Sequence, residues 1–174
     1  MLTPVSSRGP APVDPDALGD DAIGQLARYW LELADAAGGV PLRSAFDPRR
    51  VRMLLARLIV LEHLGDDDFR YRLLGTEVDR FTKARYTGRR TSEIPGHGYG
   101  NRIHALYMAT LVADRPIGMT LPYVGTSSIC SSVRQIAVPF RTGEEPDQII
   151  SLIEFELRQN VVPELIPAEQ RRLI

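Results

Sequence analysis

The chain has little cysteine and no long apolar run, and each absence excludes a class of protein. Among its 174 residues there is one cysteine, Cys130, so neither an intrachain disulfide nor a cysteine-rich zinc site can form. No stretch approaches the roughly 20 apolar residues that a membrane-spanning helix needs. Residues 1–16 also lack the basic and then apolar profile of a signal peptide. We therefore expect a cytoplasmic protein with no membrane insertion.

Basic charge is not in excess either. Lys and Arg number 21 against 22 Asp and Glu, which gives a formal net charge of −1. The composition therefore does not indicate a cationic face that binds nucleic acid, and no helix-turn-helix or basic segment indicates a transcription factor. With 44% hydrophobic residues, the chain can bury one sizeable core.

Composition divides the chain into four regions. Residues 1–19 are rich in Pro, Ser, Gly and Ala without apolar periodicity, and we expect a flexible tail there. Residues 20–57 are expected to hold N-terminal helices, and residues 58–160 the main domain. Residues 161–174 are expected to form a second tail, for which a short helix and a frayed end are both compatible with the sequence.

Helical periodicity occurs in four places. An aspartate at 20 or 21 can cap a helix that ends at Gly38-Gly39 and carries one apolar stripe. A second short helix is predicted to start at Asp47-Pro48. Residues 76–83 predict a short helix, and residues 101–114 a longer one that Pro116 closes.

Strand-like alternation occurs in five segments. Two of them flank Gly65-Asp66-Asp67-Asp68 and predict a tight hairpin, because Ile59 and Leu61, and then Phe69, Tyr71 and Leu73, alternate with polar neighbours. The other three are residues 117–124, 132–141 and 148–157, separated by turn-rich segments that favour an antiparallel meander. The predicted fold class is α+β.

The order of these features resembles the PAS superfamily, and in particular the short bacterial proteins that consist of one PAS domain behind an N-terminal helix. The resemblance covers roughly residues 25–157 and rests on Trp30, the segments 41–44 and 47–48, the hairpin with Arg70-Tyr71-Arg72-Leu73-Leu74-Gly75-Thr76, and Tyr86-Thr87-Gly88-Arg89-Arg90. It implies a five-stranded antiparallel sheet with helices across one face, preceded by an N-terminal amphipathic helix.

The resemblance also implies a function: a non-catalytic sensory or protein-interaction module in bacterial signal transduction. Its partner would be a signalling protein such as a histidine kinase, and a small apolar ligand is a further expectation. A PAS pocket lies between the helices and the inner face of the sheet, so its candidate lining residues are Phe81, Ile103, Tyr107, Met119, Tyr123 and Ile136. The alternative for these residues is a dry core.

Two groups of residues are candidates for an interface. The first is the stripe of the N-terminal helix, which either pairs two chains into a homodimer or covers the chain's own sheet; its residues are Ile23, Leu26, Trp30 and Leu33. The second is Arg70 and Arg72, which share one face of a strand. They either meet an acidic partner or pair with acidic residues of the same domain, such as Glu62.

No constellation of acid, base and nucleophile converges by spacing, so we expect no enzyme, no cofactor and no metal. His97 and His104 lack a third ligand at a usual spacing. Some haem-binding PAS domains take an axial histidine from the helix that holds His104, which keeps a haem sensor as an alternative. An enzyme with an unrecognised site is a weaker one. Residues 96–101 offer N–H groups ahead of a helix, either as an anion site or as a flexible entry to that helix.

Overall fold

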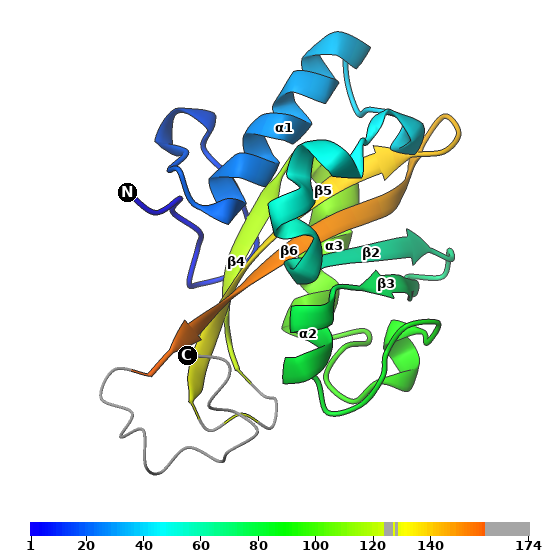
Figure 1. Cartoon of the computed structure of the whole chain (residues 1–174). Coiled ribbons are helices and arrows are strands. Elements are labelled where there is room, and N and C mark those ends of the chain that lie inside the picture. The colour runs from blue at the N-terminus through cyan, green and yellow to red at the C-terminus, as the bar shows by residue number, and fades with distance from the viewer. Residues whose placement is uncertain (124–126, 128, 159–174) are drawn as a thin grey trace.

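The computed structural model describes residues 1–123, 127 and 129–158, and it forms one antiparallel sheet with helices on both sides (Figure 1). The helices are α1 (Ala22–Ala37), α2 (Thr76–Phe81) and α3 (Arg102–Ala113), together with 3-10 segments η1 (Pro15–Ala17), η2 (Arg43–Ala45), η3 (Pro48–Arg57) and η4 (Thr91–Glu93). The strands are β1 (Ala11–Pro12), β2 (Leu58–His63), β3 (Phe69–Leu74), β4 (Ile117–Pro122), β5 (Cys130–Arg141) and β6 (Pro146–Leu157).

The sheet has six strands in the order β1-β4-β5-β6-β2-β3, and each neighbouring pair is antiparallel. The two long strands β5 and β6 form its centre, and β2 pairs with β6, so the early hairpin is joined to the end of the chain. The predicted hairpin, the later meander and the α+β class are confirmed. The predicted strand count was one too low because β1 was not expected.

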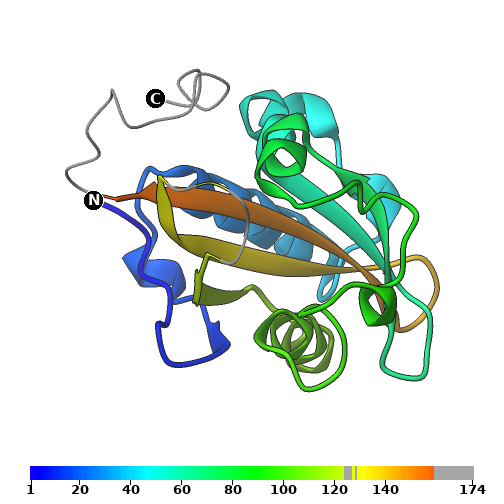
Figure 2. The same cartoon turned by 90° about the horizontal axis from the view of Figure 1, so that it is seen from below.

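Two apolar cores lie on opposite faces of the sheet, with α1 and α3 on opposite sides (Figure 2). The inner core packs α2 and α3 against residues such as Leu61, Met119 and Ile149. The outer core packs α1 and η3 against Ile136, Val138 and other residues of the same strands. Because both faces of the sheet are covered at its centre, successive side chains are buried whichever way they point in residues 133–140 of β5 and 149–152 of β6.

Helix α1 has clear signals at both ends. The carboxylate of Asp21 accepts a hydrogen bond from the N–H of Gly24 at 2.9 Å and caps the first turn. Gly38 ends the helix with φ +67°, in the left-handed region where a glycine avoids the steric cost of a Cβ. The predicted start and end of this helix are therefore found in the structure.

The N-terminal segment differs from the expected flexible tail. Ala11 and Pro12 pair with β4, and Thr3 is buried, with only 1% of its surface exposed. The cause is polar: the Thr3 hydroxyl donates to Asp21 at 2.6 Å, and the N–H of Gly19 donates to the Thr3 hydroxyl at 3.0 Å. These contacts join residues far apart in the sequence, so composition did not reveal them. The predicted tail at 161–174 lies outside the described residues.

Candidate functional site

The candidate site is a pocket on the inner face of the sheet. Its volume is about 300 Å³, and it is lined by residues from α2, the following loop, the start of α3 and strands β4, β5 and β6. This volume is at the lower end of the range found for small-molecule sites in proteins, roughly 300–1,000 Å³.

Aromatic side chains form one wall of the pocket. The rings of Phe81 and Phe155 stack with centroids 4.0 Å apart, and Tyr123 meets both edge-on, at 6.1 Å and 6.3 Å. The Tyr123 hydroxyl donates to the carbonyl of Phe81 at 2.8 Å, which joins β4 to the end of α2. Offset and edge-to-face contacts of this kind stabilise aromatic groups in fixed positions. The wall is therefore apolar and preformed.

A chain of polar side chains runs behind the pocket. The amide nitrogen of Gln135 donates to the Tyr107 hydroxyl at 3.1 Å and to Ser151 Oγ at 2.8 Å. The hydroxyls of Tyr107 and Tyr71 share a hydrogen bond, and the Tyr71 hydroxyl lies 2.7 Å from His97 Nδ1. Gln135, Tyr107 and Tyr71 are each at most 2% exposed, so the chain crosses the inner core. A buried polar network costs stability unless its members are satisfied.

The ionisable members of this chain are neutral near pH 7. Burial raises the pKa of Tyr107 to about 12 and raises that of Tyr71 well above its ordinary value, with the neighbouring Tyr107 adding to the shift. Burial lowers the pKa of His97 to about 4, helped by the charge of Arg89. The chain therefore offers hydrogen bonds without a net charge, and a ligand against it meets a neutral surface.

Positive charge is confined to the rim. Lys83 and Arg102 line the pocket and are exposed, and none of the described lining residues is Asp or Glu. The side chain of Asn101, at the N-cap of α3, makes no capping bond and donates to the carbonyl of Gly98 at 3.0 Å. The first N–H groups of a helix need an acceptor from outside the helix, so those of α3 remain open to water or an anion beside the pocket.

The structure brings three of the six predicted lining residues together. Phe81, Ile103 and Tyr123 line the pocket. Tyr107 lies one layer behind, where it bonds the lining residue Gln135, and Met119 belongs to the inner core. Neither lines the pocket.

Ile136 was assigned to the wrong face of the sheet. Successive residues of a strand point to opposite faces. Since Gln135 faces the pocket, Ile136 belongs to the outer core. Sequence reasoning missed Gln135, Phe155 and His97 as lining residues. The available signal was the alternation of β5. It failed because a polar residue such as Gln135 in a strand usually marks the side that faces solvent.

The predicted dimer stripe is covered by the chain's own sheet. Ile23 and Leu26 are fully buried, Trp30 is 3% exposed, and Leu33 packs at the edge of the outer core. The indole N–H of Trp30 donates to the carbonyl of Pro139 on β5 at 2.6 Å. Of the two alternatives for this stripe, the structure shows the one in which it covers the chain's own sheet, because the apolar surface of a six-stranded sheet needs a cover on this face as well.

Arg70 and Arg72 meet an acidic residue of their own domain. Arg72 Nη2 lies 2.6 Å from Glu62 Oε2, and Arg70 Nη1 lies 3.9 Å from the same oxygen. Glu62 is on the neighbouring strand β2, directly opposite Arg70. The structure shows the alternative in which these cations pair within their own domain. Half of the Arg72 side chain remains exposed.

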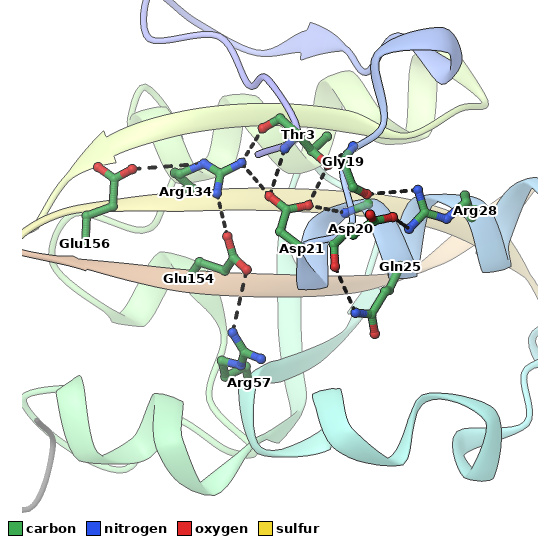
Figure 3. A network of polar contacts seen from close by, with 11 residues as sticks. Thr3, Gly19, Asp20, Asp21, Gln25, Arg28, Arg57, Arg134, Glu154 and Glu156 are labelled. Carbon is green, nitrogen blue, oxygen red and sulfur yellow. Dashed lines mark hydrogen bonds and ion pairs between the residues drawn. The ribbon is translucent and has the colours of Figure 1, made fainter. Parts of the chain in front are cut away.

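A second polar network lies on the outer face and is centred on Arg134 (Figure 3). Arg134 Nη1 is 2.6 Å from Glu154 and Nη2 is 2.9 Å from Asp21, and Nη2 also donates to the carbonyl of Thr3. Its side chain is 8% exposed. Hydrogen bonds from Thr3 and Gly24 lower the pKa of Asp21 to about 2, against the opposing effect of burial. The network fixes the N-terminal segment to the start of α1 and to β5.

His97 and His104, the histidines considered as metal or haem ligands, each contact another residue of the domain. His104 is 5% exposed, and its Nε2 lies 2.6 Å from the carbonyl of Asp67, while His97 bonds Tyr71. Within residues 1–123, 127 and 129–158, no group of three His, Cys, Asp or Glu side chains could hold a metal ion. In the same part of the chain, no helix has the length and apolarity needed to cross a membrane.

The comparison with known proteins agrees with this architecture. No curated protein and no solved structure matches the chain. The family model of the PAS domain matches residues 20–153, which is more than half of the chain and includes α1, most of the residues that line the pocket and most of the central strands. Together with the antiparallel sheet and its helices, this match shows that the chain belongs to the PAS domain family, and a PAS domain is generally a non-catalytic sensory or interaction module.

Proposed function

We propose that this protein is a cytoplasmic, non-catalytic sensory module of bacterial signal transduction that binds a small, largely apolar molecule in the inner-face pocket. The observation that carries the proposal is the pocket itself, about 300 Å³ between α2, α3 and the sheet. The inner core is closely packed elsewhere, with Leu61, Leu106 and Met119 fully buried. Protein interiors are closely packed and leave few voids of this size, which makes the pocket a candidate binding site.

The polar groups of the pocket support binding rather than catalysis. His97 has a pKa lowered to about 4, and the tyrosine hydroxyls behind it have raised pKa values, so none of them exchanges a proton readily near pH 7. The thiol of Cys130 is buried, and burial raises its pKa, so it is not an activated nucleophile. The groups are suited to hydrogen bonding with a bound molecule.

A sensory module needs a receiver, and we propose a signalling protein such as a histidine kinase. The contact surface is not the apolar stripe of α1, because the chain's own sheet covers Leu26 and Trp30. The proposal of a homodimer through that stripe therefore loses its support. Arg72 is the more accessible candidate, since half of its side chain is exposed although it pairs with Glu62. An acidic partner would compete with Glu62 for the guanidinium.

The test uses a neutral apolar dye, N-phenyl-1-naphthylamine, whose fluorescence rises when it leaves water. We expect the protein to bind it at one site, and we expect Ile103→Trp to abolish binding. Ile103 lines the pocket from the first turn of α3, so a larger side chain there fills the cavity. Native mass spectrometry of the purified protein shows in parallel whether a molecule is already bound.

The matched control is Val112→Trp on the same helix. Val112 is 80% exposed and does not line the pocket, so dye binding should be unchanged. Circular dichroism establishes that both variants keep the native fold. Equal dye binding by a folded Ile103→Trp variant and the wild type would show that the pocket is not the binding site.

A further inference from the structure

The pocket has an unused hydrogen-bond acceptor at its buried end. Both hydrogen bonds of the Gln135 amide run through Nε2, and its Oε1 accepts from no described residue. The orientation of the amide is fixed by Ser151, whose hydroxyl donates to the carbonyl of Ile136 at 2.7 Å and can therefore only accept from Gln135. Gln135 is 1% exposed and lines the pocket, and its Oε1 is not one of the fully buried side-chain atoms that lack a partner among the described residues, so this acceptor is open to the pocket.

A bound molecule that displaces water from this atom must supply a donor in its place, because an acceptor buried without a donor costs free energy. Tyr107 and Ser151 are already bonded to the amide nitrogen and do not reach Oε1. A bound molecule with a hydroxyl group at its inner end would satisfy this atom. The inner end of the pocket therefore selects a hydrogen-bond donor.

The rim selects the opposite kind of group. The first turn of α3 opens beside the pocket without a side-chain cap, and the positive end of a helix dipole attracts an anion. Arg102 and Lys83 are on the same rim, and no acidic side chain is among the described lining residues. A carboxylate is the anion that suits the rim. Its single negative charge can be met by the N–H groups of α3 and by the two exposed cations, so it does not require a buried positive side chain.

The walls between the two ends are apolar and in large part aromatic. Phe81 and Phe155 form the stacked wall, and Ile103, Leu121 and Ile153 complete it. A flat ring fits edge-on or offset against such side chains. The three regions together specify one kind of ligand, with a polar group at each end of an aromatic body.

We propose that the pocket binds a small aryl carboxylate with a hydroxyl group at the end remote from the carboxylate. The hydroxyl donates to Gln135 Oε1, and the carboxylate meets the start of α3 with Arg102 and Lys83. This inference rests on the proposed function, since it names the ligand class of the same pocket. It adds two separate requirements, a buried donor and an outer negative charge, which can be tested one at a time.

Three probes separate these requirements. They are 3-(4-hydroxyphenyl)propanoate, its methyl ester, which lacks the charge, and 3-phenylpropanoate, which lacks the hydroxyl. Isothermal titration calorimetry on the full chain should show the hydroxy acid binding about tenfold more tightly than either of the other two, since one charge-assisted or buried hydrogen bond is worth about that factor.

Variants assign each preference to a residue. Lys83→Met combined with Arg102→Met should reduce the preference for the acid over its ester, and Arg85→Met, an exposed cation that does not line the pocket, should leave that preference unchanged. Gln135→Met should remove the preference for the hydroxyl. If Gln135→Met does not fold, the relative affinities of the three probes for the wild type and for the rim variant still test the proposed ligand class.

The outcomes distinguish this inference from the function on which it rests. An ester that binds as tightly as the acid, or a hydroxyl that adds nothing, would overturn the ligand class while leaving an apolar pocket that binds the dye. Failure of all three probes, with dye binding still lost in Ile103→Trp, would also reject the ligand class alone. Failure of the dye to bind at all would reject the pocket as a binding site.

Discussion

Replacing Arg134 with methionine tests the outer network most directly, because this one side chain holds two buried carboxylates. Its guanidinium bonds Asp21 at 2.9 Å and Glu154 at 2.6 Å, and the carboxylate side chains are 7% and 16% exposed. Methionine keeps much of the length and the apolar stem but removes the charge. Removing one partner of a buried ion pair costs about 3 to 5 kcal/mol, because the other charge is left uncompensated.

The pKa of Asp21 gives a second, independent scale. A shift from 3.8 to about 2 corresponds to about 2 kcal/mol of stabilisation of the charged form, at 1.36 kcal/mol for each pKa unit. Thr3 and Gly24 contribute to this shift before Arg134 does, so only part of it disappears in the variant. The larger share of the expected loss therefore comes from leaving Glu154 without its closest cation.

The pH dependence has a definite sign. The folded-state pKa of Asp21 is depressed, so its stabilisation is present above pH 3.8 and is lost as the pH falls toward about 2. The pKa of Glu154 is raised by burial and by Asp21, with Arg134 opposing. Without Arg134 it rises further, and the penalty for a buried charge disappears as Glu154 becomes protonated. The destabilisation should therefore be largest near pH 7 and smaller near pH 4.

Trp30 provides the assay. It is the only tryptophan, it is 3% exposed, and its indole bonds the sheet on the face that carries the network. Urea unfolding followed by its fluorescence gives the free energy of unfolding at each pH. Arg52→Met, at an exposed position of η3, is the control and should change stability by less than about 0.5 kcal/mol. A loss for Arg134→Met no larger than the control, or one independent of pH, would refute the reasoning.

Three further predictions concern the two cores. The double variant Leu26→Glu and Trp30→Glu should be unfolded by circular dichroism, because both side chains lie in the outer core at 3% exposure or less; a folded monomer would mean that α1 is not part of the core. Met119→Ala should lower the free energy of unfolding by about 2 to 5 kcal/mol, and Tyr107→Phe by about 1 to 3 kcal/mol, since it leaves the Gln135 amide short of one acceptor. Urea titrations check both values, and unchanged midpoints would place these residues outside the inner core.

The sequence was most informative where one face of an element is buried and the other is not. In the hairpin of β2 and β3, Phe69 and Tyr71 are buried and the arginines between and after them are not, and the apolar positions of α1 form one buried stripe, so the types and approximate bounds of these elements were predictable from periodicity. Leu73 was predicted on the same face as Phe69 and Tyr71 but is 48% exposed, because the pairing of the two strands shifts register between Val60 and Leu61. Local capping signals at Asp21 and Gly38 fixed the ends of α1 as well. These features depend on residues close in the sequence.

The sequence was misleading where an element is buried on both faces. In β5 the polar residues Arg134 and Gln135 are both buried, one in the outer network and the other at the pocket wall. A polar side chain in a strand pattern usually indicates the solvent side, so Ile136 was taken as the inward residue. The partners that make these polar residues stable, such as Thr3 and Ser151, are distant in the sequence and leave no periodic signal.

The same alternation links the two polar networks physically. Arg134 lies between Val133 and Gln135, which both line the pocket, and it pairs across the sheet with Glu154, the residue between Ile153 and Phe155. A bound molecule that displaces these two strands must therefore also displace the guanidinium that holds the N-terminal segment. Close-packed interiors transmit such shifts because they have little free volume to absorb them. The outer network thus connects the two strands that line the pocket to the start of α1 through the contacts of Arg134 with Glu154 and Asp21.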